Sequence, residues 1–285
     1  MMNNTEQQVN VLLYGDCWPV VSAVQALVTS ILPDCKCKAI PGLPSLIQEL
    51  TRTPQAHLVL CLRPREHVFL FYALRQELAD HPTLVISDEF FFSDTVMLSI
   101  PGLLPGLTHK VLSPMIIGLK SCELHSPPSA YYPEKNALTD FLMLSPRPAV
   151  PEKILPDFHL EDCLMDHLSL LMYHALTGRG LTTLRIRLLR AIWSGHQNQE
   201  ELAGLLHVPP RKIWNDKHRL LTQLNMRGSL REILYATRFC DFQQRTAFMS
   251  PTEAERLRRE ALAEHPGNVV HPRCYQRCKS GSSAS

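Results

Sequence analysis

The sequence predicts two domains of different class: a doubly wound α/β domain in residues 1–122 and an all-α domain of four helices in residues 179–240. In the first domain, short apolar runs alternate with helical patterns, as in βαβ units. In the second, apolar residues recur with helical spacing only. Residues 181–240 also carry ten Lys and Arg against four Asp and Glu, although the net charge of the whole chain is only +2.

The N-terminal domain is predicted from the order of its apolar runs. Residues 9–13, 57–62 and 83–87 are apolar segments, typical of strands buried on both faces of a parallel sheet. Helical spacing of apolar residues covers residues 20–32 and 66–79, which lie between these strands. This alternation predicts a mostly parallel, doubly wound sheet.

Composition excludes several classes of protein. Of the 285 residues, 45% are hydrophobic and 20% are charged, which is typical of a packed globular protein. No apolar run approaches the roughly 18 residues that cross a bilayer, and the polar N-terminus lacks the pattern of a secretory signal. The nine cysteines form no regular framework. We therefore expect a cytoplasmic protein with reduced thiols and no membrane segment.

Neither a metal site nor an active site is predicted. The Cys35–Cys37 pair, and a C-terminal group of two histidines and two cysteines in residues 265–278, lack the four-ligand spacing of structural zinc sites. The sequence also lacks the GxSxG, Walker A and HExxH motifs. We expect no catalytic residue, no metal and no cofactor.

Two further segments flank the helical domain. Residues 123–178 are predicted to form a Pro-rich linker, with little regular structure, followed by a connecting helix over residues 162–176. Residues 241–285 are expected to form a charged helix and a disordered end. Ser250 suits the cap of that helix, and Pro251 suits its first position.

The basic block is predicted to contain four helices, over residues 182–194, 199–206, 210–224 and 229–239. The first helix places Arg185, Arg187 and Arg190 on its outward face. Asn198 and Glu201 have the spacing of a capping box at the start of the second helix. A short helix, a tight turn and a helix with a cationic, amide-bearing outer face are typical of a helix-turn-helix. On charge alone, a solvated basic face without a partner is an equal alternative.

The block resembles the LuxR-type (NarL/FixJ class) DNA-binding domain over about 55 residues without a gap. The matching positions are Leu181, Thr182, Leu188, Leu189, Gly195, Asn198, Glu200, Leu202, Ala203, Leu206, Val208, Ile213, Leu220, Leu224 and Met226. The resemblance implies a four-helix, DNA-binding domain. The competing interpretation is a four-helix module used only for protein contact.

Five positions depart from the pattern of that family. Arg185 stands for the usual Glu of the first helix, Pro209 for the Ser cap of the recognition helix, and Lys212 for the usual Thr. Asp216 stands for a common His, and Gln223 for the usual Lys. We expect loss of the cap to cost on the order of 1 kcal/mol, and Pro209 and Asp216 to alter the surface that reads the operator.

The resemblance implies a DNA-contacting face on the third helix, formed by Arg211, Lys212, Trp214, Asn215, Lys217, His218 and Arg219. Trp214, Asn215 and His218 are implied to face base edges, whereas the four cationic side chains contact phosphates. For Trp214 the alternative is packing on a neighbouring helix. The fourth helix resembles a dimerisation helix, which would divide Leu230, Ile233, Leu234 and Ala236 between core and dimer contact.

The N-terminal domain resembles a response-regulator receiver, a flavodoxin-like fold, with a degenerate phosphorylation pocket. Receivers have two acidic residues after strand one; here Asp16 is the one that remains, and Cys17 follows it. Ser87 fits the Thr or Ser that ends strand four. Gly106, Lys110, Ser113 and Pro114 fit the motif that follows strand five. Cys61 stands where the phosphoacceptor Asp is expected. Because Mg²⁺ needs hard oxygen ligands, the pattern implies that control by aspartyl phosphorylation is lost.

Cys61 admits two interpretations. A thiolate near Lys110 would have a lowered pKa and would make Cys61 a redox sensor. A free cysteine is more often a small buried hydrophobe.

The combined resemblance implies a bacterial transcriptional regulator that binds double-stranded DNA. It would act as a homodimer, or as a heterodimer with another LuxR-type regulator. The alternative is a protein-interaction module that sequesters a response regulator without binding DNA itself.

Overall fold

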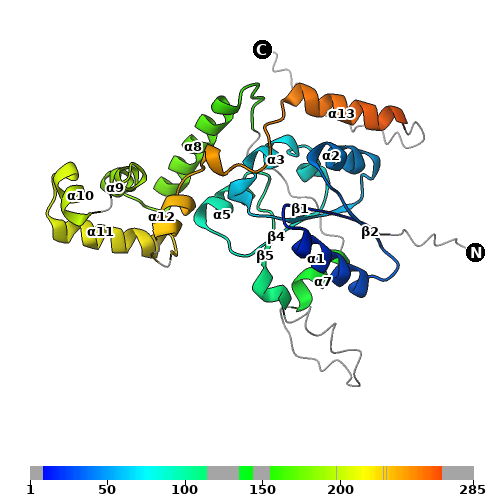
Figure 1. Ribbon diagram of the computed structural model, residues 1–285, viewed down its shortest axis with the longest axis horizontal. Helices are drawn as coiled ribbons and strands as arrows, with labels where there is room; N and C mark the ends of the chain where they lie inside the picture. The colour runs from blue at the N-terminus through cyan, green and yellow to red at the C-terminus, as the bar shows by residue number, and fades with distance from the viewer. Residues whose placement is uncertain are drawn as a thin grey trace, which may run out of the picture.

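The computed structural model describes residues 9–113, 135–143, 155–196, 198–226, 228 and 230–264 (Figure 1). A five-stranded parallel sheet has the order β2-β1-β3-β4-β5. Its strands are β1 (Asn10–Gly15), β2 (Lys36–Ala39), β3 (His57–Cys61), β4 (Thr83–Ser87) and β5 (Gly106–Thr108). This order is that of the doubly wound, flavodoxin-like fold, so the predicted class of the N-terminal domain is confirmed.

Helices cover both faces of the sheet. They are α1 (Trp18–Ile31), α2 (Leu43–Arg52), α3 (Val68–Ala73), α4 (Glu77–Asp80), α5 (Phe92–Ser99) and α7 (Lys135–Met143), with the 3-10 turn η1 (Pro64–Glu66) before α3. Apolar residues of α1 and α7 share one buried cluster with one set of strand side chains, and those of α2 to α5 share another with the alternate set. The central strands β3 and β4 are buried along their whole length, which explains their apolar sequences.

Several elements differ from the prediction. The single helix expected over residues 66–79 is broken into η1, α3 and α4, and Arg75 turns back over the ring of Tyr72, 4.4 Å from its centroid. Gly106 begins β5 rather than following it. Helix α7 lies inside the predicted Pro-rich linker, where Leu138, Phe141 and Leu142 are buried against the α1 face of the sheet.

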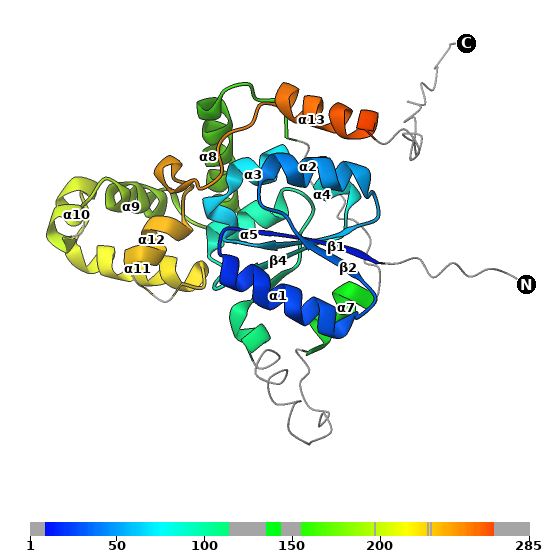
Figure 2. The same cartoon turned by 45° about the vertical axis from the view of Figure 1, so that its right-hand side comes forward.

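The C-terminal region is helical, as predicted. Its elements are α8 (Glu161–Gly178), α9 (Thr183–Trp193), α10 (Gln199–Leu206), α11 (Pro210–Gln223), α12 (Leu230–Ala236), the 3-10 turn η2 (Asp241–Gln243) and α13 (Pro251–Glu264). Figure 2 shows α9 to α12 as a separate bundle beside the sheet, joined to it through α8 and α5. Within the described residues, no helix is long and apolar enough to span a membrane.

The last described helix is not a free tail. After α12 the chain returns across the N-terminal domain, and α13 packs along α2 (Figure 1). The predicted charged helix is therefore present, but one side of it is buried through Ala254, Leu257, Arg258 and Ala261. The remainder of the predicted tail, residues 265–285, lies outside the described residues.

Candidate nucleic-acid interface

Helices α10 and α11 are joined by a tight turn over residues 207–209. The Asn198 side chain caps α10 by accepting a hydrogen bond from the Glu200 amide at 3.0 Å. His207 ends α10 in the left-handed conformation, with φ of 54°. Pro210 occupies the first turn of α11, and its carbonyl accepts a hydrogen bond from Gln199 Nε2 at 2.8 Å. The turn and the Gln199–Pro210 hydrogen bond are local contacts that help to set the angle between the two helices.

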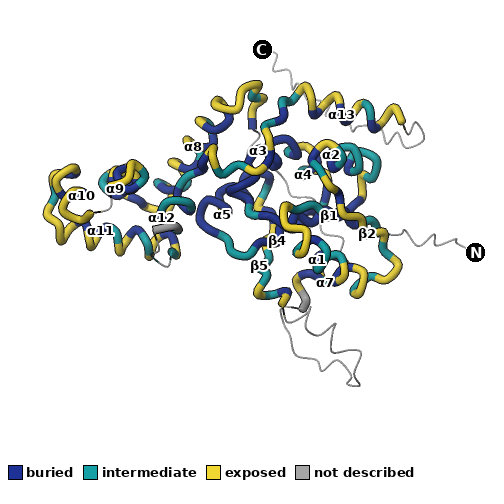
Figure 3. The backbone as a smooth tube through the Cα atoms, viewed as in Figure 1, coloured by how far each residue is buried: buried dark blue, intermediate teal, exposed yellow. Residues whose placement is uncertain are grey.

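Helix α11 has one buried side and one exposed side. Ile213 and Leu220 are almost completely buried in the core of the four-helix bundle. Of the seven side chains predicted to contact DNA, Lys217 is half-buried, and six are exposed: Arg211, Lys212, Trp214, Asn215, His218 and Arg219. Figure 3 shows exposed positions along α11, in the helical bundle beside the sheet domain. The helix therefore presents cationic, aromatic and amide groups together to solvent.

Trp214 does not pack on a neighbouring helix. Its exposed fraction is 60%, and its ring stacks on that of His218, with centroids 5.8 Å apart and planes 5° apart. The two residues are separated by one helical turn, so the stack lies on the outer surface of α11. The packing alternative for Trp214 is therefore not supported.

Two of the residues that depart from the family pattern are buried rather than exposed. Arg185 Nε lies 3.2 Å from Asp216 Oδ1, and Arg185 Nη1 donates a hydrogen bond of 2.7 Å to Gln223 Oε1. Lys212 Nζ approaches Asp216 Oδ2 at 3.6 Å from the solvent side. The predicted outward position of Arg185 is wrong, and Asp216 does not belong to the surface that was expected to read an operator. Both side chains face the inside because each supplies the opposite charge to the other.

Helix α12 contacts the N-terminal domain. Ile233 and Ala236 are buried and Leu234 is half-buried, whereas the side chain of Leu230 lies outside the described residues. The hydroxyl of Ser93 in α5 donates a hydrogen bond of 2.8 Å to the carbonyl of Tyr235 in α12. The dimer contact expected for this helix therefore remains a prediction, and its observed contacts are with α5 and α9.

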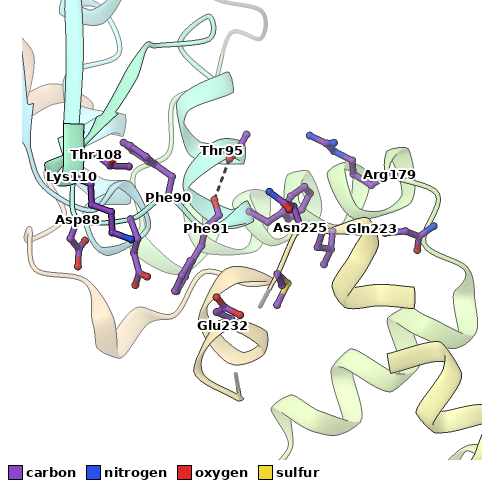
Figure 4. A pocket seen from close by; sticks show the side chains of 14 residues that line it. Asp88, Phe90, Phe91, Thr95, Thr108, Lys110, Arg179, Gln223, Asn225 and Glu232 are labelled. Atoms are coloured by element: carbon purple, nitrogen blue, oxygen red, sulfur yellow. Dashed lines mark hydrogen bonds between the residues drawn. The ribbon is translucent and has the colours of Figure 1, made fainter. Parts of the chain in front are cut away.

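A cavity of about 710 Å³ lies between the bundle and the sheet domain (Figure 4). Phe90, Phe91 and Asn225 lie in its middle, with Lys110 at one end and Arg179 at the other. The predicted receiver-pocket residue Lys110 thus faces this interdomain cavity.

The other four predicted pocket residues meet at the carboxyl ends of the strands. Asp16, Cys17, Cys61 and Ser87 line a separate cavity of about 340 Å³. The pairing of Gly15 with Cys61 in adjacent strands brings the first three of them together. Three cationic or basic residues that were not predicted also line it: Arg63, His109 and Arg245.

Asp16 is held by two basic side chains. His67 Nε2 lies 3.3 Å from Asp16 Oδ2, and the Arg245 guanidinium donates a hydrogen bond to the same oxygen. These contacts, led by the hydrogen bond from His67, lower the pKa of the Asp16 carboxyl despite its partial burial. The negative charge of the Asp16 carboxylate is thus already balanced by basic groups of the same chain.

Cys61 is buried, with an exposed fraction of 2%. Burial raises the pKa of its thiol to about 12, and the Asp16 charge adds to the effect. Because Lys110 lines the other cavity, the environment favours the buried-hydrophobe interpretation over the redox interpretation.

Arg63 and Arg245 were missed for different reasons. Arg63 lies two residues after the end of β3, and its guanidinium bonds to both carboxylate oxygens of Asp88, with Nε 2.8 Å from Oδ1. Its position after a buried strand was a usable signal. Arg245 is 229 residues from Asp16, and nothing in the sequence pattern connects them. In the part of the chain that the structure describes, no group of three His, Cys, Asp or Glu side chains is placed to hold a metal ion.

No family model and no curated protein matches the sequence. Among solved structures, full-length FixJ from B. japonicum is similar, with 11% identity and a TM-score of 0.33 over 79% of this chain and 94% of that chain. The response regulator StyR has 14% identity and a TM-score of 0.30 over 80% of this chain and 98% of that chain. The RcsB response regulator of Salmonella typhimurium has 12% identity and a TM-score of 0.29 over 80% and 96%. At these TM-scores, the assignment of the fold rests on the strand order and the helices described above.

Proposed function

We propose that this protein is a transcriptional regulator that binds double-stranded DNA through α11, without control by aspartyl phosphorylation. The observation that carries the proposal is the exposed side of α11, where cations flank Trp214, Asn215 and His218. An α-helix of this kind fits the major groove, where Asn pairs with adenine and cations meet phosphates. Such a regulator acts in the cytoplasm, as a homodimer or together with another regulator of the LuxR type.

Two features support independence from phosphorylation. The residue at the end of β3 is Cys61, which offers neither a carboxylate acceptor nor a hard oxygen ligand for Mg²⁺. Asp16 accepts hydrogen bonds from His67 and Arg245 of the same chain. Its charge is therefore balanced by protein groups, whereas a phosphorylation site needs it for a metal ion.

The test of DNA binding is selection of duplexes from a random pool, followed by affinity measurements at several salt concentrations. Direct binding predicts that affinity falls steeply with salt, because phosphate contacts release counterions. The Lys217→Ala/Arg219→Ala variant should bind at least tenfold more weakly, with a salt slope reduced by about two.

The matched control is Arg256→Ala/Arg259→Ala, which removes two exposed cations of α13 instead. This control should bind like the native protein. If the native chain binds no duplex, either alone or with a second regulator present, the sequestration alternative replaces the proposal.

A further inference from the structure

Residues 241–264 form a continuous segment that returns from the helical bundle to the N-terminal domain; we call it the strap. It consists of η2, an extended stretch and α13 (Figure 2). Besides the packing of α13 on α2 and the exposed pair of Arg52 with Glu264, three groups of contacts join it to the N-terminal domain. Each group uses different chemistry.

The first contact is made by Gln244 and Arg245 with η1. The Gln244 side chain accepts a hydrogen bond from the Val68 amide at 2.9 Å and donates one to the Arg65 carbonyl at 3.0 Å. The Arg245 amide donates to the Glu66 carbonyl at 2.8 Å. These bonds use both the donor and the acceptor of the Gln244 amide, so they fix the position of the strap at this point.

The Arg245 guanidinium joins two carboxylates of the N-terminal domain. Its Nε lies 3.0 Å from Glu66 Oε2, and its Nη1 donates to Asp16 Oδ2. Glu66 is largely buried, whereas the Arg245 side chain is 51% exposed. Solvent and other ligands therefore reach the Arg245 contact readily, whereas the contact of Arg258 in α13 is buried.

The second contact is apolar. Phe248 stacks on Tyr72 of α3, with centroids 6.0 Å apart and planes 12° apart, and meets Phe69 edge-on at 5.7 Å. Beside it, Thr246 is hydrogen-bonded to His67 Nδ1 at 2.8 Å. Burial of these rings stabilises the middle of the strap against α3.

The third contact is a buried ion pair between α13 and α4. Arg258 donates to both carboxylate oxygens of Glu77, at 2.7 and 3.0 Å, and to the Ala73 carbonyl at 3.0 Å. The two carboxylate oxygens and the carbonyl together accept hydrogen bonds from the buried guanidinium, which therefore keeps its charge paired away from water. This contact fixes α13 while α13 lies along α2.

The other end of the strap is fixed to the helical bundle. Thr237, at the end of α12, accepts a hydrogen bond of 3.0 Å from Trp193 Nε1 of α9 and donates one to the Ile233 carbonyl at 2.5 Å. Only Arg238, Phe239 and Cys240 separate Thr237 from the strap, and the last two are buried. Such a short connection leaves α9 and α12 little freedom relative to the anchored strap.

We propose that the strap is a clamp within the chain that holds the helical bundle against α5, with Arg245 as its releasable contact. In addition to its connection through α8, the bundle is then held by the direct α5–α12 contact and by the strap. Loss of the Arg245 contact leaves Asp16 and Glu66 without their shared cation and weakens the first anchor. The proposal does not rest on DNA binding.

The test is hydrogen exchange of the full chain, measured by mass spectrometry for Arg245→Gln and for the control Arg259→Gln. The control removes a charge from the exposed face of α13, where Arg259 is 71% exposed. In Arg245→Gln, amides of α5 and α12 should exchange at least fivefold faster, while those of β3 and β4 stay unchanged. Equal exchange of α5 and α12 in Arg245→Gln and in the native chain would overturn the proposal.

A second variant, Glu77→Gln/Arg258→Met, removes both charges of the buried pair together, so that neither remains unpaired. It should accelerate exchange in α13, α5 and α12. Faster exchange in α13 alone, with β3 and β4 protected, contradicts the clamp. If β3 and β4 also lose protection, the fold itself is weakened, and the result for Arg245→Gln decides.

Discussion

The Nε atom of Arg185 lies 3.2 Å from Oδ1 of Asp216, and both side chains are buried between α9 and α11. Arg185 also donates a hydrogen bond to Gln223. All three residues depart from the pattern of the LuxR-type domain, and the structure brings them into one network. The charge of Arg185 is therefore balanced by that of Asp216 inside the bundle.

This pair predicts strong coupling in stability. Arg185→Met should lower the free energy of unfolding by roughly 3 kcal/mol, because it leaves Asp216 buried with only Lys212 nearby. The double variant Arg185→Met/Asp216→Leu should recover much of that loss, since no buried charge remains unpaired. Urea denaturation of both variants and of Asp216→Leu measures the coupling. Additive effects of the two single changes would contradict the proposed network.

Asn215 and Arg219 should differ in how they affect DNA binding. Both are exposed on α11, but an amide is suited to a base edge and a guanidinium to phosphate. Asn215→Ala should weaken the binding free energy for the preferred duplex by about 1–3 kcal/mol and change binding to other duplexes little. Specificity at one base position is then relaxed. Arg219→Ala should weaken binding to all duplexes alike. Competition assays with single-base variants of a selected duplex distinguish the two patterns.

Cys61 should resist alkylation at neutral pH. Burial raises the pKa of its thiol to about 12, so the reactive thiolate is scarce at pH 7 to 8. Iodoacetamide should modify the exposed Cys17 and Cys163 long before Cys61, as measured by peptide mass spectrometry. Rapid modification or peroxide oxidation of Cys61 in the folded protein would restore the redox hypothesis.

The predictable part of the fold follows from local patterns. β1, β3 and β4 were predicted because their buried positions make them apolar, whereas β2 (LysCysLysAla) is an edge strand with exposed lysines and β5 has only three residues. Helix α7 was missed because prolines surround it in the sequence. Its buried face is defined only by contact with the sheet.

In the candidate site, too, some features could be predicted from local sequence patterns and others depend on contacts between distant residues. The exposed side of α11 follows from helical periodicity, which places Ile213 and Leu220 inside and Trp214 outside. Periodicity failed for Arg185, whose burial depends on Asp216, 31 residues away. Helical periodicity also could not predict the contact of Arg245 with Asp16, because that contact depends on the return of the strap to the N-terminal domain.

Asp16 should contribute to stability in a pH-dependent manner. Its contacts with His67 and Arg245 lower the pKa of the folded-state carboxyl below its ordinary value. A carboxyl of this kind stabilises the fold above its unfolded-state pKa, near 4, and loses that contribution as the pH falls through the folded-state pKa. Urea midpoints should therefore differ between native protein and Asp16→Asn at pH 6, and the difference should shrink progressively as the pH falls below about 4. A constant difference between pH 6 and pH 2.5 would show that the Asp16 charge is not the cause.

Gly15 should tolerate no side chain, because β1 and β3 approach closely at the pocket. A Cβ at Gly15 would lie 2.8 Å from both Cys61 Cβ and Val21 Cγ2, and closer still to the Cys61 carbonyl oxygen. Since a backbone oxygen of a central strand has little room to move, Gly15→Ala should lower the free energy of unfolding by about 1–3 kcal/mol or more.

Gly204 in α10 provides the matched control for that substitution. A Cβ there meets nothing within 4 Å, so Gly204→Ala should stabilise the helix by roughly 0.5–1 kcal/mol. Chemical denaturation of both variants compares the same change in a crowded strand and an open helix. If Gly15→Ala is as stable as the native chain, β1 and β3 are farther apart at the pocket than described, and the contacts of Asp16 must be reassigned with them.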